Sequence, residues 1–301
     1  MNIPWDDLRL FLSVAEQGSF SAAARALKLG QPTLSRRIAE LESQLGAPLF
    51  TRASQGVSLT ALGLRLLPSA QHMAVWAAEA ALQQGQRMQA KVRIAAPPVA
   101  AYGFVAPMVV DIRRAHPGLQ IELLSAVRVL NLGRGEADIS LRTIAPQDPD
   151  LLCIDQISVP IKAYASEAYQ KSLPPHCAAS DLDWICWAPP YDDVRSNKTL
   201  RALIPNFRPA FTSDDYNVQL AACRSGVGAM LMPAARHRYS QIQAVVELPL
   251  EIDPEFMGHF YMVCHKRTAD LSSVVAVQRV ISAEFAYMRS QQANFALTEQ
   301  Q

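Results

Sequence analysis

The sequence predicts a multidomain α+β protein in which an N-terminal helical module is joined by one long helix to two α/β units. Residues 20–39 give two helical segments around a glycine turn, which is the pattern of a helix-turn-helix. A mostly apolar seam then recurs every three or four positions over residues 59–84. From residue 91 strand and helix patterns alternate, which is typical of α/β folds.

Composition indicates an ordinary globular protein, for which the cytoplasm is the expected compartment. Of 301 residues, 50% are hydrophobic and 18% are charged. Because 28 Lys and Arg face 27 Asp and Glu, net charge does not indicate a nucleic-acid partner. The five cysteines and six histidines lack the spacing of a disulfide framework or a metal site, and no signal peptide or membrane span is expected.

The N-terminal module should contain three helices. The first covers residues 5–17 and ends at Gly18. The second should be capped by Ser21 and should end in a turn at Leu29-Gly30, where glycine would take a positive φ. Pro32 suits the first turn of the third helix, since its missing N–H has no helical partner there.

The third helix can be oriented from its own spacing. One stripe contains Leu34, Ile38, Leu41 and Leu45 and should pack inward. The other side carries Pro32 and, near the N-terminus of the helix, a guanidinium, hydroxyls and an amide from Arg36, Thr33, Ser35 and Gln31. A helix-turn-helix protein reads base edges with this end of this helix, but spacing alone equally allows an ordinary amphipathic surface helix.

A β-hairpin and a long helix follow. Residues 48–59 give two extended pieces around a Ser-Gln-Gly turn, which predicts a wing, and Arg52 lies where it could reach DNA. Thr60 should cap a helix that runs to about Met88 and is kinked or loosened at Pro68. Its seam is rich in small residues, which favours contact between two chains over a core helix. The seam contains Leu59, Leu62, Leu66, Ala70, Met73, Ala77, Ala80 and Gln84.

The C-terminal half should form two lobes, each with a parallel sheet covered on both faces. Strands are expected near residues 92–96, 119–124, 135–141, 158–164, 184–187, 210–212, 229–232 and 260–264. Helices are expected at 103–115, 128–134, 216–225 and 270–290, with a frayed polar end after 290. The chain should pass between the lobes near Pro160 and return near His265, which leaves a hinged cleft for a small ligand.

With these residues in view, the chain resembles the LysR-type transcriptional regulators over essentially its whole length. The most specific segments are 8–24 (LRLFLSVAEQGSFSAAA), 31–38 (QPTLSRRI), 49–52 (LFTR) and 59–63 (LTALG). Residues 135–139 (GEADI) and 225–233 (SGVGAMLMP) match more loosely. The resemblance implies a winged helix-turn-helix over 1–60, a linker and dimerisation helix over 61–89, and a periplasmic-binding-protein-like effector domain over 90–301. The first lobe would then cover 90–161 and 266–301, and the second 162–265.

The resemblance also implies a homodimer or homotetramer on an inverted repeat of double-stranded DNA, controlled by a small-molecule effector. The DNA contacts carry over to Gln31, Pro32, Thr33, Ser35 and Arg36, and to Arg52 on the wing. Ser54 and Gln55 stand where the family often has a second basic residue, so wing contacts should be weaker.

The effector site departs from the family pattern. The family places Ser or Thr after the first strand of this domain, whereas this chain has Pro97-Pro98, which removes two N–H donors and disfavours the usual carboxylate site. The candidate cleft residues are Pro98, Ser125, Arg142, Trp187 and Thr212. Arg142 suits an anionic effector, with a surface ion pair as the alternative.

Two other functions compete with regulation. An enzyme is disfavoured because the Gly-x-Ser-x-Gly, Walker and Gly-x-Gly-x-x-Gly motifs are missing, and Asp214-Asp215 suits a helix cap. No cofactor is therefore predicted. Redox sensing through Cys186 and Cys223 is open but disfavoured, since isolated buried thiols are usually inert.

Overall fold

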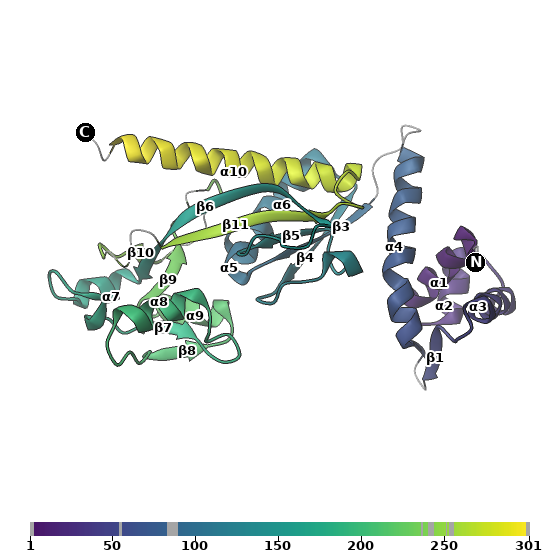
Figure 1. Cartoon of the computed structure of the whole chain (residues 1–301), viewed down its shortest axis with the longest axis horizontal. Coiled ribbons are helices and arrows are strands. Elements are labelled where there is room, and N and C mark those ends of the chain that lie inside the picture. Colours follow the sequence, from purple (N-terminus) through teal and green to yellow (C-terminus); the bar gives the residue numbers. More distant parts are fainter. Residues whose placement is uncertain are drawn as a thin grey trace.

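The computed structural model describes residues 3–53, 56–82, 90–235, 237–239, 244–250, 252 and 256–298. In Figure 1 the chain begins in a small helical module, continues through one long helix, and ends in a two-lobed α/β part. This is the predicted order of units.

Three helices form the N-terminal module: α1 (Trp5–Gln17), α2 (Phe20–Leu27) and α3 (Gln31–Leu45). They share one core that includes Leu10, Phe11, Leu34 and Ile38, each buried. Two predicted details are wrong. Ser19, not Ser21, caps α2, because its hydroxyl accepts from the N–H of Ala22. The positive φ between the helices belongs to Lys28 (+55°), while Gly30 has φ of −69° as the residue before α3.

The hairpin forms as predicted, from antiparallel strands β1 (Phe50–Ala53) and β2 (Gly56–Leu59). Ser54 and Gln55 of the predicted turn lie outside the described residues. The carboxylate of Glu42 on α3 accepts from the backbone N–H groups of Leu49, at 2.6 Å, and Phe50, at 3.3 Å. These bonds fix the start of the hairpin against the third helix.

Helix α4 (Ala61–Leu82) is the linking helix. The hydroxyl of Thr60 accepts from the N–H of Gly63 at 3.1 Å, as a cap should, and the helix runs through position 68 without a break. The predicted seam divides into two parts. Leu62, Leu66 and Ala70 pack into the core of the N-terminal module, whereas Met73 and Ala77 are exposed. The side chain of Ala80, and residues 83–89, lie outside the described part.

The first lobe is built on a mixed sheet, so the expectation of a parallel sheet is only half right. Strands β3 (Ala90–Ala96), β4 (Leu119–Ser125) and β5 (Ile139–Arg142) are parallel. Strand β11 (Met257–His265) runs antiparallel to β5 and to β6 (Leu151–Ala165). The two-residue alternation of a strand indicates where the strand lies but not the direction in which it runs relative to its neighbours.

Helices cover one face of this sheet. They are α5 (Pro98–Ala100), the π-helical turn η1 (Ala101–Val105), α6 (Ala106–Ala115) and α10 (Ser272–Thr298). The run α5–α6 starts five residues before the predicted helix, and α10 continues to Thr298 where a frayed end was expected. The predicted helix at 128–134 is wrong, since only the 3-10 turn η2 (Leu132–Arg134) is helical there.

The second lobe grows from the far half of β6, which pairs with β9 (Met230–Pro233) and β10 (Val246–Glu247). Strands β7 (Ile185–Trp187) and β8 (Phe211–Ser213) pair in parallel, and α9 (Tyr216–Arg224) packs on them. Helices α7 (Glu167–Ser172) and α8 (Arg195–Leu203), and the 3-10 turn η3 (Ala179–Asp181), were not predicted.

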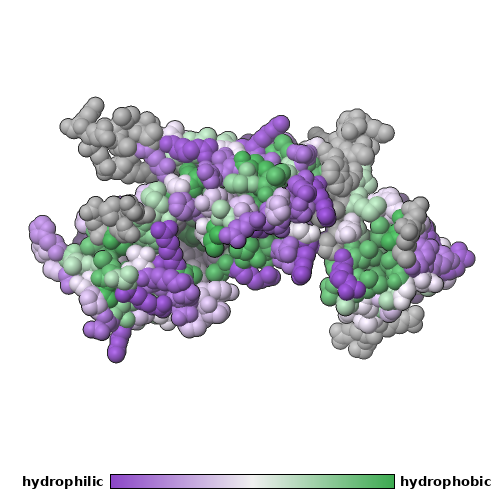
Figure 2. Space-filling view, viewed as in Figure 1, coloured by the Kyte–Doolittle hydropathy of each residue, from purple (hydrophilic) through white to green (hydrophobic). Residues whose placement is uncertain are grey.

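Two long strands connect the lobes. Strand β6 pairs with β11 as far as Pro160, opposite Met257, and with β9 from Ile161 onward. The predicted return at His265 lies at the other end of β11, deep in the first lobe. The surface is hollowed where the two lobes meet, with hydrophobic residues on its walls (Figure 2).

Candidate functional site

The solvent-facing side of α3 carries the residues expected to contact DNA. Gln31, Pro32, Thr33 and Arg36 are exposed and Ser35 is half-buried. The Arg36 side chain is 74% exposed, and its Nε lies 3.7 Å from Oε1 of Glu40 one turn later. An exposed pair at this distance is weak, so the guanidinium is available to another partner.

The buried side of α3 and the ion pairs of Arg37 fix the helix so that this face points outward. Leu34, Ile38 and Leu41 on the opposite side are each at most 1% exposed. The next arginine, Arg37, binds the carboxylates of Asp6 and Asp7 in the first turn of α1. The bond from Arg37 holds the pKa of Asp6 below its usual range. Sequence reasoning missed this bridge, because Arg37 and the two carboxylates are about 30 residues apart and meet only when α1 and α3 pack.

Gln31 is held at the N-terminus of α3. The hydroxyl of Ser21 on α2 donates to Oε1 of Gln31 at 3.2 Å. Ser21, which was expected to cap a helix, therefore links the two helices of the motif instead. Such a contact fixes where the amide sits relative to a groove placed against α3.

Arg52 lies on β1, where its backbone is opposite Val57 of β2. Its side chain lies outside the described part of the structure. The strand position places residue 52 on the hairpin that Glu42 anchors to α3.

In the first lobe, Arg142 lies at the end of β5 and is 9% exposed. Its Nη2 donates to the carbonyl of Leu130 at 3.0 Å and its Nε to the hydroxyl of Ser140 at 3.2 Å. Burial lowers the pKa of Arg142. The surface-pair alternative is therefore wrong, because the side chain is buried and holds the loop after β4.

Arg142 borders a small void of about 280 Å³, including the part open to solvent. Its walls also contain Ala96 and Pro97 from the end of β3, and Val127 and Leu130 from the loop. Pro98 begins α5 directly beyond Pro97, and Ser125 is exposed at the end of β4. These candidates thus lie along one edge of the first-lobe sheet, at the carboxyl ends of its parallel strands.

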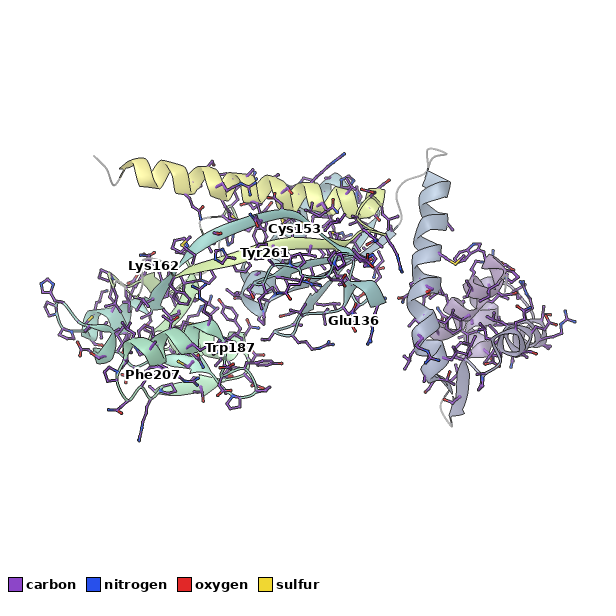
Figure 3. The ribbon with its side chains drawn as sticks, viewed as in Figure 1. Glu136, Cys153, Lys162, Trp187, Phe207 and Tyr261 are labelled. Carbon is purple, nitrogen blue, oxygen red and sulfur yellow. The ribbon has the colours of Figure 1, made fainter. Side chains whose placement is uncertain are left out.

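The remaining candidates belong to the second lobe. Trp187 (Figure 3) ends β7 and is half-buried, with its ring centroid 6.0 Å from that of Tyr191. Thr212 is exposed on the neighbouring strand β8. Both residues belong to the second lobe, whereas Pro98 belongs to the first.

Two tyrosines bridge the lobes and were missed by sequence reasoning. The rings of Tyr102, from η1, and Tyr216, from α9, lie 6.4 Å apart. Val99 of the first lobe also packs on the apolar cluster around Tyr216 and Trp187. Val99, next to Pro98, and Trp187 therefore pack on the same apolar cluster, although they come from opposite lobes.

The residues that could suggest enzymatic or redox chemistry are a helix cap and two buried thiols. The carboxylate of Asp215 caps α9 by accepting from the N–H groups of Asn217 and Val218, as predicted for this acidic pair. Burial raises the pKa of the Cys186 thiol to about 12 and that of Cys223 to about 11. Within the described residues, no cluster of three metal-ligating side chains occurs and no helix is long and apolar enough to cross a bilayer.

Two family descriptions match the chain. Residues 5–64 match "Bacterial regulatory helix-turn-helix protein, lysR family" and residues 85–286 match "LysR substrate binding domain". An HTH-type transcriptional regulator of Xanthomonas campestris is 32% identical over 167 residues, which is 54% of this chain and 48% of that protein. The regulator IlvY of Escherichia coli is 34% identical over 141 residues, or 45% and 48%. The chain thus spans about half the length of these two relatives.

Solved structures share the fold. A full-length OxyR variant from Pseudomonas aeruginosa has a TM-score of 0.66 at 18% identity and covers 93% of this chain and 95% of its own. LysG of Corynebacterium glutamicum, with bound effector Arg, has a TM-score of 0.55 at 19% identity and covers 92% and 98%. With family matches over both the helical module and the two-lobed part, the chain belongs to the LysR family of bacterial regulatory helix-turn-helix proteins.

Proposed function

We propose that this protein is a sequence-specific DNA-binding transcriptional regulator, and not an enzyme, and that it acts in the cytoplasm. The single observation that carries the proposal is the outward face of α3. Gln31, Thr33 and Arg36 project from a helix whose other side is locked into the core and tied to α1 by Arg37. A guanidinium and an amide on one exposed helix end are the groups that read guanine and adenine edges.

The readers are Gln31, Pro32, Thr33, Ser35 and Arg36, with Arg52 on the hairpin contacting the backbone. The functional units are a DNA-binding domain over 1–60, a linker helix over 61–89 and an effector domain over 90–301. Within the effector domain, the boundary between the two lobes lies where β6 and β11 pass from one lobe to the other.

Two copies act together on an inverted repeat of double-stranded DNA, as a homodimer or as the pair of dimers in a homotetramer. The exposed Met73 and Ala77 on α4 support a contact between helices of two chains. A dimer with twofold symmetry places its two α3 helices on half-sites of opposite orientation.

A small molecule bound between the lobes controls this binding. Pro98, Ser125 and Arg142 contribute from the first lobe, and Trp187 and Thr212 from the second. Hydrogen bonds hold Nε and Nη2 of Arg142, so Nη1 is the nitrogen that would meet an anionic group. Because β6 and β11 are the hinge strands, a ligand touching both lobes would change their relative angle.

The experiment is selection of binding sites from random duplex DNA by the full chain. We expect the selected duplexes to share an inverted repeat with half-site centres about 10.5 base pairs, or a multiple of this, apart. Enrichment of no common sequence would contradict the proposal. Repeating the selection with Arg36→Lys separates base reading from charge, because lysine keeps the cation but loses the two-pronged donor geometry.

A further inference from the structure

A second void lies within the first lobe, away from the Arg142 edge. It is enclosed by α5–η1, the sheet face of β5, β6 and β11, helix α10 and the segment after β9. Its walls include Leu141, Phe104, Phe260, Phe285, Met288 and His237. The space between these side chains is about 510 Å³, including the part that opens to solvent. Protein cores normally pack with few gaps larger than a water molecule, so a void here is unusual.

The wall at Gly103 faces this empty space. Gly103 is buried, yet a Cβ placed on it would have no heavy atom within 4 Å. The residue lies in η1, a π-helical turn within the run from α5 to α6. Such turns insert one extra residue and occur frequently at functional sites. At most buried helix positions a side chain fills the space beside the backbone, whereas at Gly103 this space is left open.

The ring of His237 contributes polar nitrogen atoms to this largely apolar lining. Nδ1 of His237 is buried and has no hydrogen-bond partner among the described residues. The ring packs edge-on against Phe104, with centroids 5.4 Å apart and planes at 74°. Burial is the main influence on His237 and lowers its pKa, which favours the neutral imidazole at pH 7. A buried ring nitrogen without a partner costs stability, and a ligand hydroxyl would remove that cost.

We propose that this void is a second ligand site, which binds a small uncharged aromatic molecule through one hydroxyl group on Nδ1 of His237. The ring of the ligand would lie among Phe104, Phe260 and Phe285. Among the described residues, the lining includes no lysine, arginine, aspartate or glutamate. A charged ligand would lose its hydration there without gaining a counterion. A hydroxyl can donate or accept, so it fits either tautomer of the imidazole.

The site is tested by fluorine NMR of 4-fluorophenol with the full chain in the absence of DNA. Fluorobenzene and 4-fluorobenzoate serve as probes that lack the hydroxyl or carry a charge. We expect saturable binding of 4-fluorophenol, about fivefold weaker binding of fluorobenzene, as for one neutral hydrogen bond, and still weaker binding of 4-fluorobenzoate. Because DNA is absent, failure here leaves the regulatory proposal untouched.

Two sets of variants assign the binding to this void. Gly103→Leu should abolish binding by filling the space, whereas the matched Ala115→Leu, at the exposed end of α6, should not. His237→Leu should reduce the affinity of 4-fluorophenol to that of fluorobenzene and leave fluorobenzene unchanged, and His237→Asn should restore part of the loss. Circular dichroism confirms that each variant is folded. Absence of saturable binding, or equal binding by folded Gly103→Leu, would overturn the proposal.

Discussion

Arg36 and Arg37 are neighbours on α3 with opposite environments. The guanidinium of Arg37 binds Asp6 and Asp7 of α1, whereas the Arg36 side chain is 74% exposed and approaches Glu40 at 3.7 Å. One arginine therefore fixes the helix and the other is presented by it. Substitutions at Arg36 and Arg37 should therefore have different effects.

Arg36→Ala should weaken binding to a selected duplex more than binding to random DNA. The expected difference is about 1–3 kcal/mol if the guanidinium makes a two-pronged contact with guanine. Competition titrations at one fixed salt concentration measure it. Equal losses on both duplexes would show that Arg36 contributes charge and not base reading.

Arg37→Met should reduce the stability of the N-terminal module and change its response to acid. In the native protein the pKa of Asp6 is lowered, chiefly by its bond with Arg37, so this pair stabilises the fold above the unfolded pKa of about 3.9. That stability is lost as pH falls through the lower, folded pKa. Urea denaturation between about pH 7 and pH 3 should show a smaller acid loss in Arg37→Met. An unchanged acid profile would contradict the bridge.

Sequence reasoning placed the elements of the N-terminal module well because their apolar spacing is regular. It misassigned details that only tertiary geometry decides, such as which of Ser19 and Ser21 caps α2. Helix α8 was missed because it is short and polar, and the direction of β11 was missed because a period of two residues does not encode pairing.

In the candidate sites as well, features within one helix could be predicted, whereas contacts between elements could not. The exposed face of α3 followed from spacing alone. The bonds of Arg142 to Leu130 and Ser140, and the bridge from Arg37 to α1, join distant or loop-held groups. Such pairs depend on how elements pack, so a single sequence gives no direct signal for them.

Arg52→Ala should lower affinity for all duplexes alike. A backbone contact carries no sequence information, and its loss should reduce the slope of log affinity against log salt by about 1. The test is a salt titration with one selected and one scrambled duplex. A wild-type slope in the variant would place Arg52 away from the phosphates.

Arg142→Met should destabilise the effector domain by about 1–3 kcal/mol, because the carbonyl of Leu130 loses a buried donor. Urea denaturation measures this loss, and Arg142→Lys should recover part of it. Wild-type stability in Arg142→Met would mean that the guanidinium is not structural and serves the ligand alone.

Gly228→Ala should cost at least about 2 kcal/mol of stability. A Cβ there would lie 2.1 Å from the carbonyl oxygen of Asp183, a backbone atom in the strand pairing of the second lobe. Gly103→Ala is the matched control, since its Cβ would enter open space. Comparable denaturation midpoints for the two variants would show that the close approach at Gly228 is not tight.

The central claim is that two copies of α3 read opposed half-sites, and footprinting of the full chain on a selected duplex tests it most directly. Methylation protection should show guanines shielded in two major grooves related by a twofold axis, and Arg36→Ala should lose that protection. Uniform protection along the duplex, or protection that Arg36→Ala leaves intact, would contradict the account.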